Sequence, residues 1–308
     1  MSAKNIAIAI LAGLISVACT GAPSRPAMAN DADCAASETI GRFDPATDLF
    51  IAQFDIKTDT DDLHSAAAVA TMLAHPRFAC VDYLAVSGTY GMQGGSYVDP
   101  DTLFEKAFGD RWIEAHNNRD TATQTLAARI APVIANGGHV WIMEAGQSDV
   151  SAATIAALPD GLRPPEIKAR VHIVQHSDWN ERVTSPEALE RVKREVDYIK
   201  IADGNAVGNG TPGFNTDDRS AWPALLSAAS VGAIWQQAQA LALKYNGSGH
   251  DDQSIAVGGY DNQAIGAGGL DFSDTSEAAY IFGYDAIYDV DAFVAAFVQS
   301  GAQGSPRP

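Results

Sequence analysis

The sequence LFIAQFDIKTDTDDLHSAAAV at residues 49–69 contains the pattern that decides the fold. Its first part, Leu49 to Phe54, is a short apolar run bounded by polar residues, which is typical of a buried β-strand. The stretch from Leu63 to Ala74 is rich in alanine and is predicted to form a helix that ends at His75-Pro76, because the residue before a proline is disfavoured in a helix. A strand that leads into a helix is the start of a β-α unit.

The same alternation of short apolar runs and helix-like stretches continues along the chain. Further strands are predicted at residues 80–86, 140–143, 170–175 and 198–201, and further helices at 121–136, 151–158, 186–196, 221–243 and 290–298. Strands separated by helices favour parallel pairing through right-handed connections. No Pro/Gly/Ser-rich linker or fixed-period repeat divides the chain. We therefore predict an α/β fold, a mostly parallel central sheet flanked by helices, in a single domain over residues 45–300, with a lead-in at 30–44 and a disordered tail at 301–308.

The first 29 residues resemble a targeting segment. Lys4 precedes an apolar run from Ile6 to Val17, which has the length of a signal-peptide core and is too short to span a bilayer. The A-x-A site at residues 27–29 predicts cleavage after Ala29, so that residues 1–29 are a signal peptide. Lipid modification at Cys19 is the open alternative. Either route predicts an exported protein, periplasmic or secreted, and no other apolar stretch is long enough to cross a membrane.

Composition and charge limit the class of partner. The 308 residues are 46% hydrophobic and 19% charged, which is a globular composition. There are 20 Lys and Arg against 38 Asp and Glu, a net charge of -18. This charge argues against nucleic acid or an anionic membrane as a partner, since either would be repelled. It is compatible with a divalent cation and a neutral small molecule, while the oligomeric state stays open.

Two cysteines remain after cleavage at Ala29, Cys34 and Cys80. A reactive thiol or a metal ligand would be expected within a C-x-x-C motif or a Cys/His cluster, and neither cysteine has one nearby. In an oxidising compartment a structural disulfide is the favoured interpretation.

Polar residues follow each predicted strand, and four aspartates follow the first one. In parallel α/β sheets, ligands bind beyond the carboxyl ends of the strands. The four aspartates lie within eight residues, so their mutual repulsion is costly unless a cation or solvent screens it. One interpretation is an exposed loop that caps the next helix. The buried strand before the run and the close-packing helix after it favour a metal site, and oxygen ligands of this kind suit Ca²⁺ or Mg²⁺. The four residues are Asp55, Asp59, Asp61 and Asp62.

The segment DIKTDTDDLHSAAAV at residues 55–69 resembles the first-strand motif D-x-D-x-x-x-D-D of the nucleoside-hydrolase superfamily. It departs at Lys57, which stands where that family has its second Asp. It is more similar to a secreted branch, the nucleoside-hydrolase-like domain of cellulose-binding proteins, whose motif reads D-I-G-G-D-P-D-D-x-x-S. The matching residues are Asp55, Ile56, Asp59, Asp61, Asp62 and Ser65.

Three later segments extend the resemblance over residues 50–285. VWIMEAGQSDVSAATIAAL at 140–158 resembles V-W-G-G-x-N-T-L-A-x-A-L, and RVHIVQHSDWNE at 170–181 resembles a strand that ends in D-Q-D-D. DFSDTSEAAYIF at 271–282 resembles E-G-D-T-P-S-F-L-Y-L. These later matches are less specific than the first.

The resemblance implies the nucleoside-hydrolase fold with one Ca²⁺ at the strand ends, in preference to Mg²⁺. In such enzymes an Asp deprotonates a calcium-bound water, which attacks the anomeric carbon through an oxocarbenium-like transition state. Lys57 replaces the residue that is the base there, so Asp59 is the candidate catalytic base. The implied ligands are Asp55, Asp59, Asp62, Asp274 and the backbone carbonyl of Asp149.

Other residues are candidates for substrate contact, each with a structural alternative. The loops at 203–205 and 209–215 resemble the ribose-contacting loop of that family, and amides suit sugar hydroxyls, but the loops are also turn-rich. His176 is a candidate acid for the leaving group or a structural histidine, and Trp179 either stacks on a ring or packs in the core. The candidate substrate-binding residues are Asp61, Asn180, Asn205, Asn209, Asn215 and Trp179.

Two functions follow as hypotheses. The first is an exported, metal-dependent hydrolase of an N-glycosidic or other glycosidic bond, acting on a nucleoside or another glycosyl compound. The second is a secreted carbohydrate-binding protein that has the same fold and no hydrolytic activity. Lys57 keeps the second hypothesis open.

Overall fold

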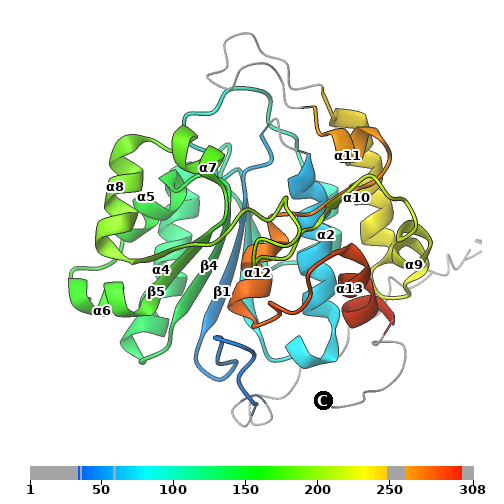
Figure 1. The fold of residues 1–308 in the computed structure, drawn as a ribbon. Coiled ribbons are helices and arrows are strands. Elements are labelled where there is room, and N and C mark those ends of the chain that lie inside the picture. Colours follow the sequence, from blue (N-terminus) through cyan, green and yellow to red (C-terminus); the bar gives the residue numbers. More distant parts are fainter. Residues whose placement is uncertain (1–33, 35–36, 58–59, 248–260, 300–308) are drawn as a thin grey trace, which may run out of the picture.

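Six parallel strands form the central sheet in the order β3-β2-β1-β4-β5-β6 (Figure 1). The computed structural model describes Cys34 and residues 37–57, 60–247 and 261–299. The strands are β1 (Leu49–Phe54), β2 (Asp82–Ser87), β3 (Trp112–Glu114), β4 (Val140–Ala145), β5 (Val171–Gln175) and β6 (Asp197–Lys200). Two short strands pair antiparallel outside this sheet, β7 (Asn215–Thr216) and β8 (Leu270–Asp271). The predicted α/β fold with a parallel central sheet is confirmed.

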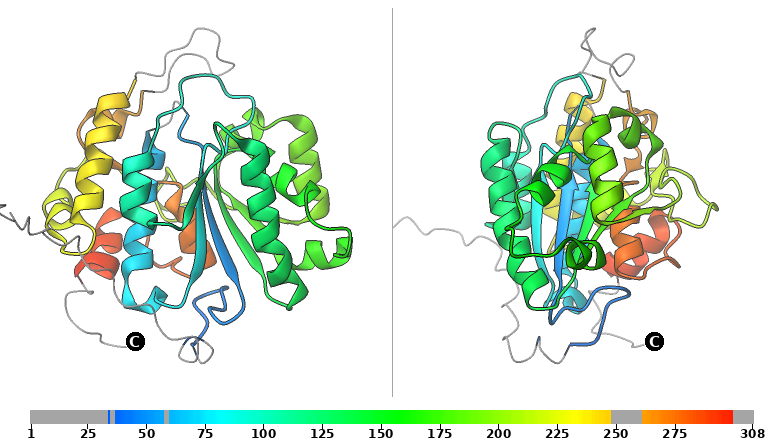
Figure 2. Two further views of the ribbon diagram at one scale, coloured as in Figure 1. Left: turned by 180° about the vertical axis from the view of Figure 1, so that it is seen from behind. Right: turned by 90° about the vertical axis from the view of Figure 1, so that its left-hand side faces the viewer.

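Helices cover both faces of the sheet, as the two views of Figure 2 show. On one face pack α4 (Arg119–Ala135), α5 (Asp149–Ala156), α6 (Pro164–Arg170) and α8 (Pro186–Glu195). On the other pack α2 (Asp61–Ala74), α3 (Asp101–Phe108), α9 (Trp222–Ser227), α10 (Gly232–Tyr245), α12 (Thr275–Ile281) and α13 (Val290–Val294). The remaining helical segments are η1 (Pro76–Phe78), α7 (Asp178–Val183), α11 (Gln263–Gly266) and the π-helix η2 (Ala295–Gln299).

Strand β1 explains why two cores form. Successive side chains of a strand point to opposite faces of the sheet. Phe50 and Phe54 therefore join the core on the α2 side, whereas Leu49 and Ile51 join the core on the α4 side. All six residues of β1 are buried, because β2 and β4 pair with it on either edge and a hydrophobic core covers each of its faces.

The prediction of a single helix over 221–243 is wrong. The chain there forms α9 and α10, separated by residues 228–231. Trp222-Pro223 suits the first turn of a helix, where the missing proline N–H would be unpaired in any case. A second helix then begins at Gly232, where a β-carbon would lie 2.4 Å from the Leu226 carbonyl oxygen. The close contact between the two helices therefore requires a glycine.

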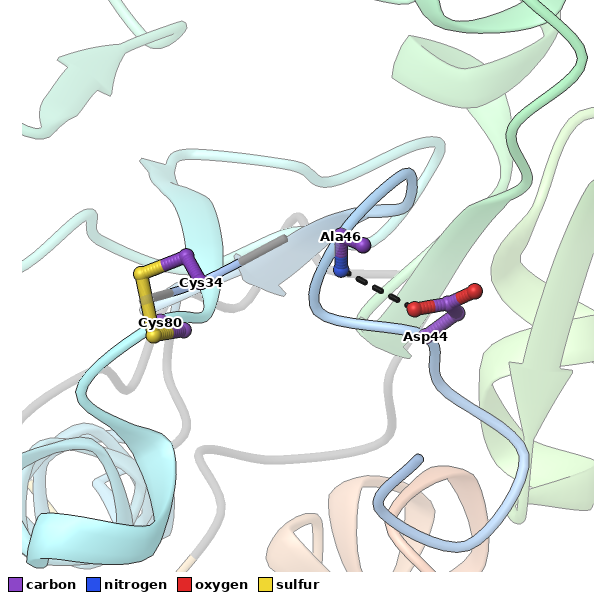
Figure 3. The surroundings of a disulfide bond; sticks show 4 residues. All are labelled: Cys34, Asp44, Ala46 and Cys80. Atoms are coloured by element: carbon purple, nitrogen blue, oxygen red, sulfur yellow. Dashed lines mark hydrogen bonds between the residues drawn. A yellow bond between two sulfur atoms is a disulfide. The ribbon is translucent and has the colours of Figure 1, made fainter. Parts of the chain in front are cut away.

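The predicted disulfide is confirmed: Cys34 and Cys80 are bonded, with their Cα atoms 5.2 Å apart (Figure 3). Cys80 lies just before β2, so the bond ties the lead-in to the amino-terminal edge of the sheet. The lead-in also contacts the end of α12, where Arg42 N–H donates to the Ile281 carbonyl at 2.9 Å. In the part of the chain that the structure describes, no helix is long and apolar enough to cross a membrane. The predicted signal peptide, Cys19 and the tail at 301–308 lie outside the described residues.

Candidate functional site

The candidate site lies between β1 and β4, where the order in which the chain adds strands to the sheet reverses. Strands β2 and β3 lie on one side of β1, and strands β4, β5 and β6 lie on the other side. The loops after β1 and β4 therefore separate at the carboxyl edge, and such a switch point is where α/β proteins bind ligands. Asp55 follows β1 and Gln147 follows β4, on the two sides of this switch point.

Asp55 is held from two sides. Its Oδ1 accepts a hydrogen bond from Lys57 N–H at 2.9 Å, and its Oδ2 accepts one from Gln147 Nε2 at 2.9 Å. The Gln147 amide also donates to Asn180 Oδ1 at 3.1 Å. Asp55 and Asn180 are buried, 4% and 7% exposed, so these contacts fix both side chains in one direction.

Asp62 anchors a strained turn. Ile56 has a φ of 49°, a left-handed conformation that is rare for a β-branched residue. Its N–H donates to Asp62 Oδ2 at 2.6 Å, which ties the first turn of α2 back to the end of β1. Strain of this kind persists only where the surrounding structure holds it, and it is concentrated at functional sites.

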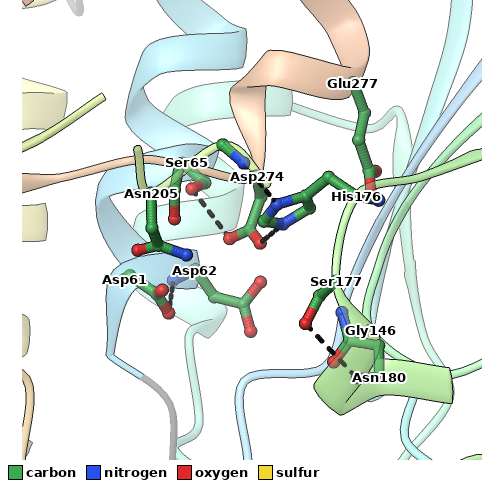
Figure 4. Close-up of polar contacts among 12 residues, drawn as sticks. Asp61, Asp62, Ser65, Gly146, His176, Ser177, Asn180, Asn205, Asp274 and Glu277 are labelled. Atoms are coloured by element: carbon green, nitrogen blue, oxygen red, sulfur yellow. Dashed lines mark hydrogen bonds and ion pairs between the residues drawn. The ribbon is translucent and has the colours of Figure 1, made fainter. Parts of the chain in front are cut away.

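Asp274 meets these residues from the far end of the chain. Its Oδ2 accepts from Ser65 Oγ at 2.9 Å, and its Oδ1 lies 3.1 Å from His176 Nε2. Figure 4 shows the Asp62 and Asp274 carboxylates turned toward the same space, with Ser177 and Asn180 across from them. The structure thus brings together residues from α2, the loop before α12, and the segment after β5.

Both ring nitrogens of His176 have partners. Gly204 N–H donates to Nδ1 at 3.0 Å, so Nδ1 is the acceptor and Nε2–H donates to Asp274. Burial by itself lowers the pKa of His176, but the carboxylates of Asp203, Asp274 and Glu277 outweigh burial and raise it to about 10. A ring protonated at both nitrogens would have to give up the Gly204 contact and donate toward Asp203 Oδ1, which is 3.7 Å from Nδ1. The geometry as it stands fits the neutral ring.

Further buried acids surround this cluster. Glu277 accepts from His176 N–H at 2.9 Å, and burial raises its pKa well above the usual value. Burial also raises the pKa of Asp271 to about 7, although Asn215 and Asn262 each donate to its Oδ2 at 2.7 Å. Acids that are this buried cost free energy when ionised unless positive charge is near.

The chemistry of the donors fits a hard cation. Asp55, Asp62 and Asp274 offer only oxygen, and an ionised carboxylate has about four acceptor positions, more than these hydrogen bonds use. Within the described residues, however, no group of three His, Cys, Asp or Glu is arranged closely enough to hold an ion. A bound ion therefore needs additional oxygens. Asp59, the sequence-predicted ligand and base, lies outside the described residues.

Three other predicted site residues, Asp61, Asp149 and Trp179, have contacts of their own. Asp61 is buried at the start of α2, and its Oδ1 accepts from Asp62 N–H at 2.9 Å. The Asp149 side chain contacts Ser185, whose N–H donates to Asp149 Oδ2 at 3.2 Å. The Trp179 ring is half-buried, with the Arg182 guanidinium 5.5 Å from its centre. The predicted roles of these residues stay predictions.

Three of the four candidate asparagines, Asn205, Asn209 and Asn215, form part of a loop network. Asn215 Nδ2 donates to Asn205 Oδ1 at 2.9 Å, and Asn205 Nδ2 donates to Asp203 Oδ1 at 3.0 Å. Asn209 Nδ2 donates to the Asp203 carbonyl at 2.7 Å. Asn205 and Asn209 are exposed, so both the turn-forming role and contact with a ligand are compatible with this geometry.

Sequence reasoning missed two residues of the site, Gln147 and Glu277. Both lie in the segments already singled out, directly after a predicted strand or beside Asp274. Their positions alone do not reveal their partners, because Gln147 bonds to residues 92 and 33 positions away. Comparison with protein-family models, with curated proteins and with solved structures gave no match to this chain.

Proposed function

We propose that this chain is an exported, metal-dependent hydrolase of a glycosidic bond, either the N-glycosidic bond of a nucleoside or that of another glycosyl compound. One observation carries the proposal: the buried carboxylates of Asp62 and Asp274 face the same space, with the buried Asp55 directly after β1, although Asp274 is over 200 positions from the other two in sequence. Carboxylates that face one another in a buried site repel each other unless a cation lies between them, which favours a bound cation as the reason for the arrangement.

Each residue has a role under this proposal. Asp55, Asp62 and Asp274 would hold calcium together with further oxygens, and the bound ion would supply a water of lowered pKa. His176 holds the Asp274 carboxylate in place through the Nε2–H bond. Asp59 is the proposed base. Asn180, whose amide bonds to Gln147 and Gln175, lies across from the Asp62 and Asp274 carboxylates and is a proposed contact for a sugar hydroxyl.

The same sheet order is also used to bind dinucleotides, through a glycine-rich turn and the amino terminus of the first helix. Here that helix begins with Asp61 and Asp62, both buried. Two carboxylates at this position repel a pyrophosphate, which disfavours a dinucleotide. The net charge of -18 disfavours any polyanion in the same way.

A secreted carbohydrate-binding protein without hydrolysis is the second candidate. Lys57 favours it, since the resembled enzymes have an Asp at this position. The Lys57 ammonium lies 4.1 Å from the centre of the Tyr90 ring. This is a cation–π contact, which an aspartate at position 57 could not make. This contact offers a structural reason for the lysine.

A panel of nucleosides and oligosaccharides, assayed with calcium and with a chelator, separates the two. We expect turnover with calcium, its loss with chelator, and its loss in Asp274→Asn, while Asp82→Asn retains it. Asp82 is half-exposed at the opposite end of β2, where it pairs with Arg129 at 2.8 Å. Saturable sugar binding without turnover would support the binding protein, and neither binding nor turnover would contradict both.

A further inference from the structure

Gln147 is the residue that connects the loops after β1 and β4, on the two sides of the switch point. It is fully buried, 0% exposed, and each polar group of its side chain has a partner. Nε2 donates to Asp55 Oδ2 at 2.9 Å and to Asn180 Oδ1 at 3.1 Å, and Oε1 accepts from Gly91 N–H at 2.9 Å. Its own backbone N–H donates to the Thr89 carbonyl at 2.9 Å. One amide thus links the loops after β1, β2 and β4 with α7.

These partners allow only one orientation of the amide. Two of them are oxygens that accept, and the third is an N–H that donates. A flipped amide would place its oxygen against the oxygens of Asp55 and Asn180 and its NH₂ group against the N–H of Gly91. The donor side of Gln147 therefore always faces Asp55 and Asn180.

The amide is itself held in a wider network. Asn180 Nδ2 donates to Gln175 Oε1 at 3.3 Å, and Gln175 Nε2 donates to the carbonyls of Glu144 and Gly146 at 2.9 Å each. The network leads from β5 back to the segment that carries Gln147. A side chain bound at every atom within a closed network is rigid.

Gly91 shows how closely the parts fit. A β-carbon at this position would lie 2.2 Å from Asp149 Oδ2 and 2.7 Å from the Val183 carbonyl oxygen. Only glycine lets the loop after β2 come near enough for its N–H to reach Gln147. The position of the amide is thus set by backbone as well as by side chains.

We propose that Gln147 is a positioning residue that directs the Asp55 carboxylate toward the cation and couples it to Asn180 on the substrate side. This rests on the function proposed above. One Asp55 oxygen is held by Gln147 and the other by Lys57 N–H, so the plane of the carboxylate is determined. Outer partners that orient a ligand in this way typically change metal affinity about 10- to 100-fold when removed.

The test compares calcium affinity, measured by calorimetry on the full mature chain, in wild type and two variants. Gln147→Met removes the amide and keeps the length of the side chain, and Gln147→Asn keeps the amide and shortens its reach. Gln53→Met is the matched control, because Gln53 is 1% exposed and its Oε1 accepts from Ser151 instead. We expect both Gln147 variants to bind calcium at least tenfold more weakly and the control to bind as wild type does.

A mutant cycle with Asp55→Asn distinguishes positioning from general loss of stability. If Gln147 acts through Asp55, Gln147→Met adds little to the loss that Asp55→Asn already causes, whereas independent effects add. Thermal melting without calcium identifies any variant that is unfolded, and Gln147→Asn then replaces Gln147→Met. Unchanged affinity in a folded variant, or additive losses, overturns the proposal while the proposed function stands. Absence of calcium binding in wild type overturns both.

Discussion

Glu144 is an acid buried completely inside the sheet region, 0% exposed on β4. Its Oε2 accepts a hydrogen bond from Ser148 Oγ at 2.7 Å. Burial raises its pKa to about 7, and the nearby Asp149 charge acts in the same direction, whereas hydrogen bonds from Ser151 and Ser148 lower it. The folded state therefore holds this proton more tightly than the unfolded chain, where the pKa is 4.5.

This difference predicts a stability that falls with rising pH. Below pH 4.5 the Glu144 carboxyl is protonated in both the folded and the unfolded state. As the pH rises to about 7, the free energy of unfolding falls progressively, by about 3 kcal/mol in total. Glu144→Gln should remove that loss, so that its free energy of unfolding relative to wild type is higher at pH 8 than at pH 4.5. Urea unfolding at both values tests this. Equal pH dependence of Glu144→Gln and wild type would contradict the assignment.

At the scale of single residues, the sequence predicts chemistry better than contacts. Asp55, Asp62 and Asp274 could be named because aspartates after strands and a resemblance pointed to them. The left-handed Ile56 could not, because its side chain type favours extended backbone and only the Asp62 contact holds it otherwise. Gln147 could not either, since its role depends on three distant partners.

The disulfide belongs to the scale of elements, because it joins the lead-in to the start of β2. Cys34 and Cys80 are separated by 46 positions, and closing a loop of this length stabilises the fold by about 3 to 4 kcal/mol on chain entropy. The double variant Cys34→Ser/Cys80→Ser should have a free energy of unfolding, measured by urea titration, that is lower by that amount. Intact mass after alkylation without reductant should show no alkylated thiol at either position in the wild-type protein. Two alkylated thiols would refute the bond in solution.

Elements with a strong pattern were predictable, and short ones were not. The runs that became β1, β4 and β5 are fully buried, so their apolar sequence identifies them. The edge strand β3 has three half-buried residues, which leave no alternation to detect. Helix α3 and helix α12 were missed because eight and seven residues offer few helical periods. The break between α9 and α10 depends on a tertiary contact at Gly232.

At the scale of the whole molecule, the candidate site connects segments that are far apart in sequence. Asp55 and Asp62 lie around the start of α2, and Asp274 lies before α12. A ligand that binds only the folded arrangement stabilises all of it, by about 2.7 kcal/mol at a concentration 100-fold above its dissociation constant. We therefore expect calcium to raise the thermal midpoint of the mature protein, and chelator to lower it.

The variants define what that shift means. Asp55→Asn and Asp274→Asn should each lose most of the calcium-dependent shift, and Asp82→Asn should keep it. Magnesium at the same concentration should give a smaller shift, because it requires near-ideal octahedral geometry. An unmoved wild-type midpoint would mean that these buried aspartates only hold the turn at Ile56 and its neighbours in place, and the proposed hydrolase would fall with the metal.

The two hydrophobic cores do not include the loop at residues 203–213, and this has a consequence for the evolution of the protein. Exchanging residues 205–212 of this loop, which leaves Gly204 and its N–H bond to His176 in place, therefore alters the surface beside the site at little risk to folding. A lineage could retarget such a molecule by replacing loops alone, and a laboratory library restricted to residues 205–212 would sample that same route.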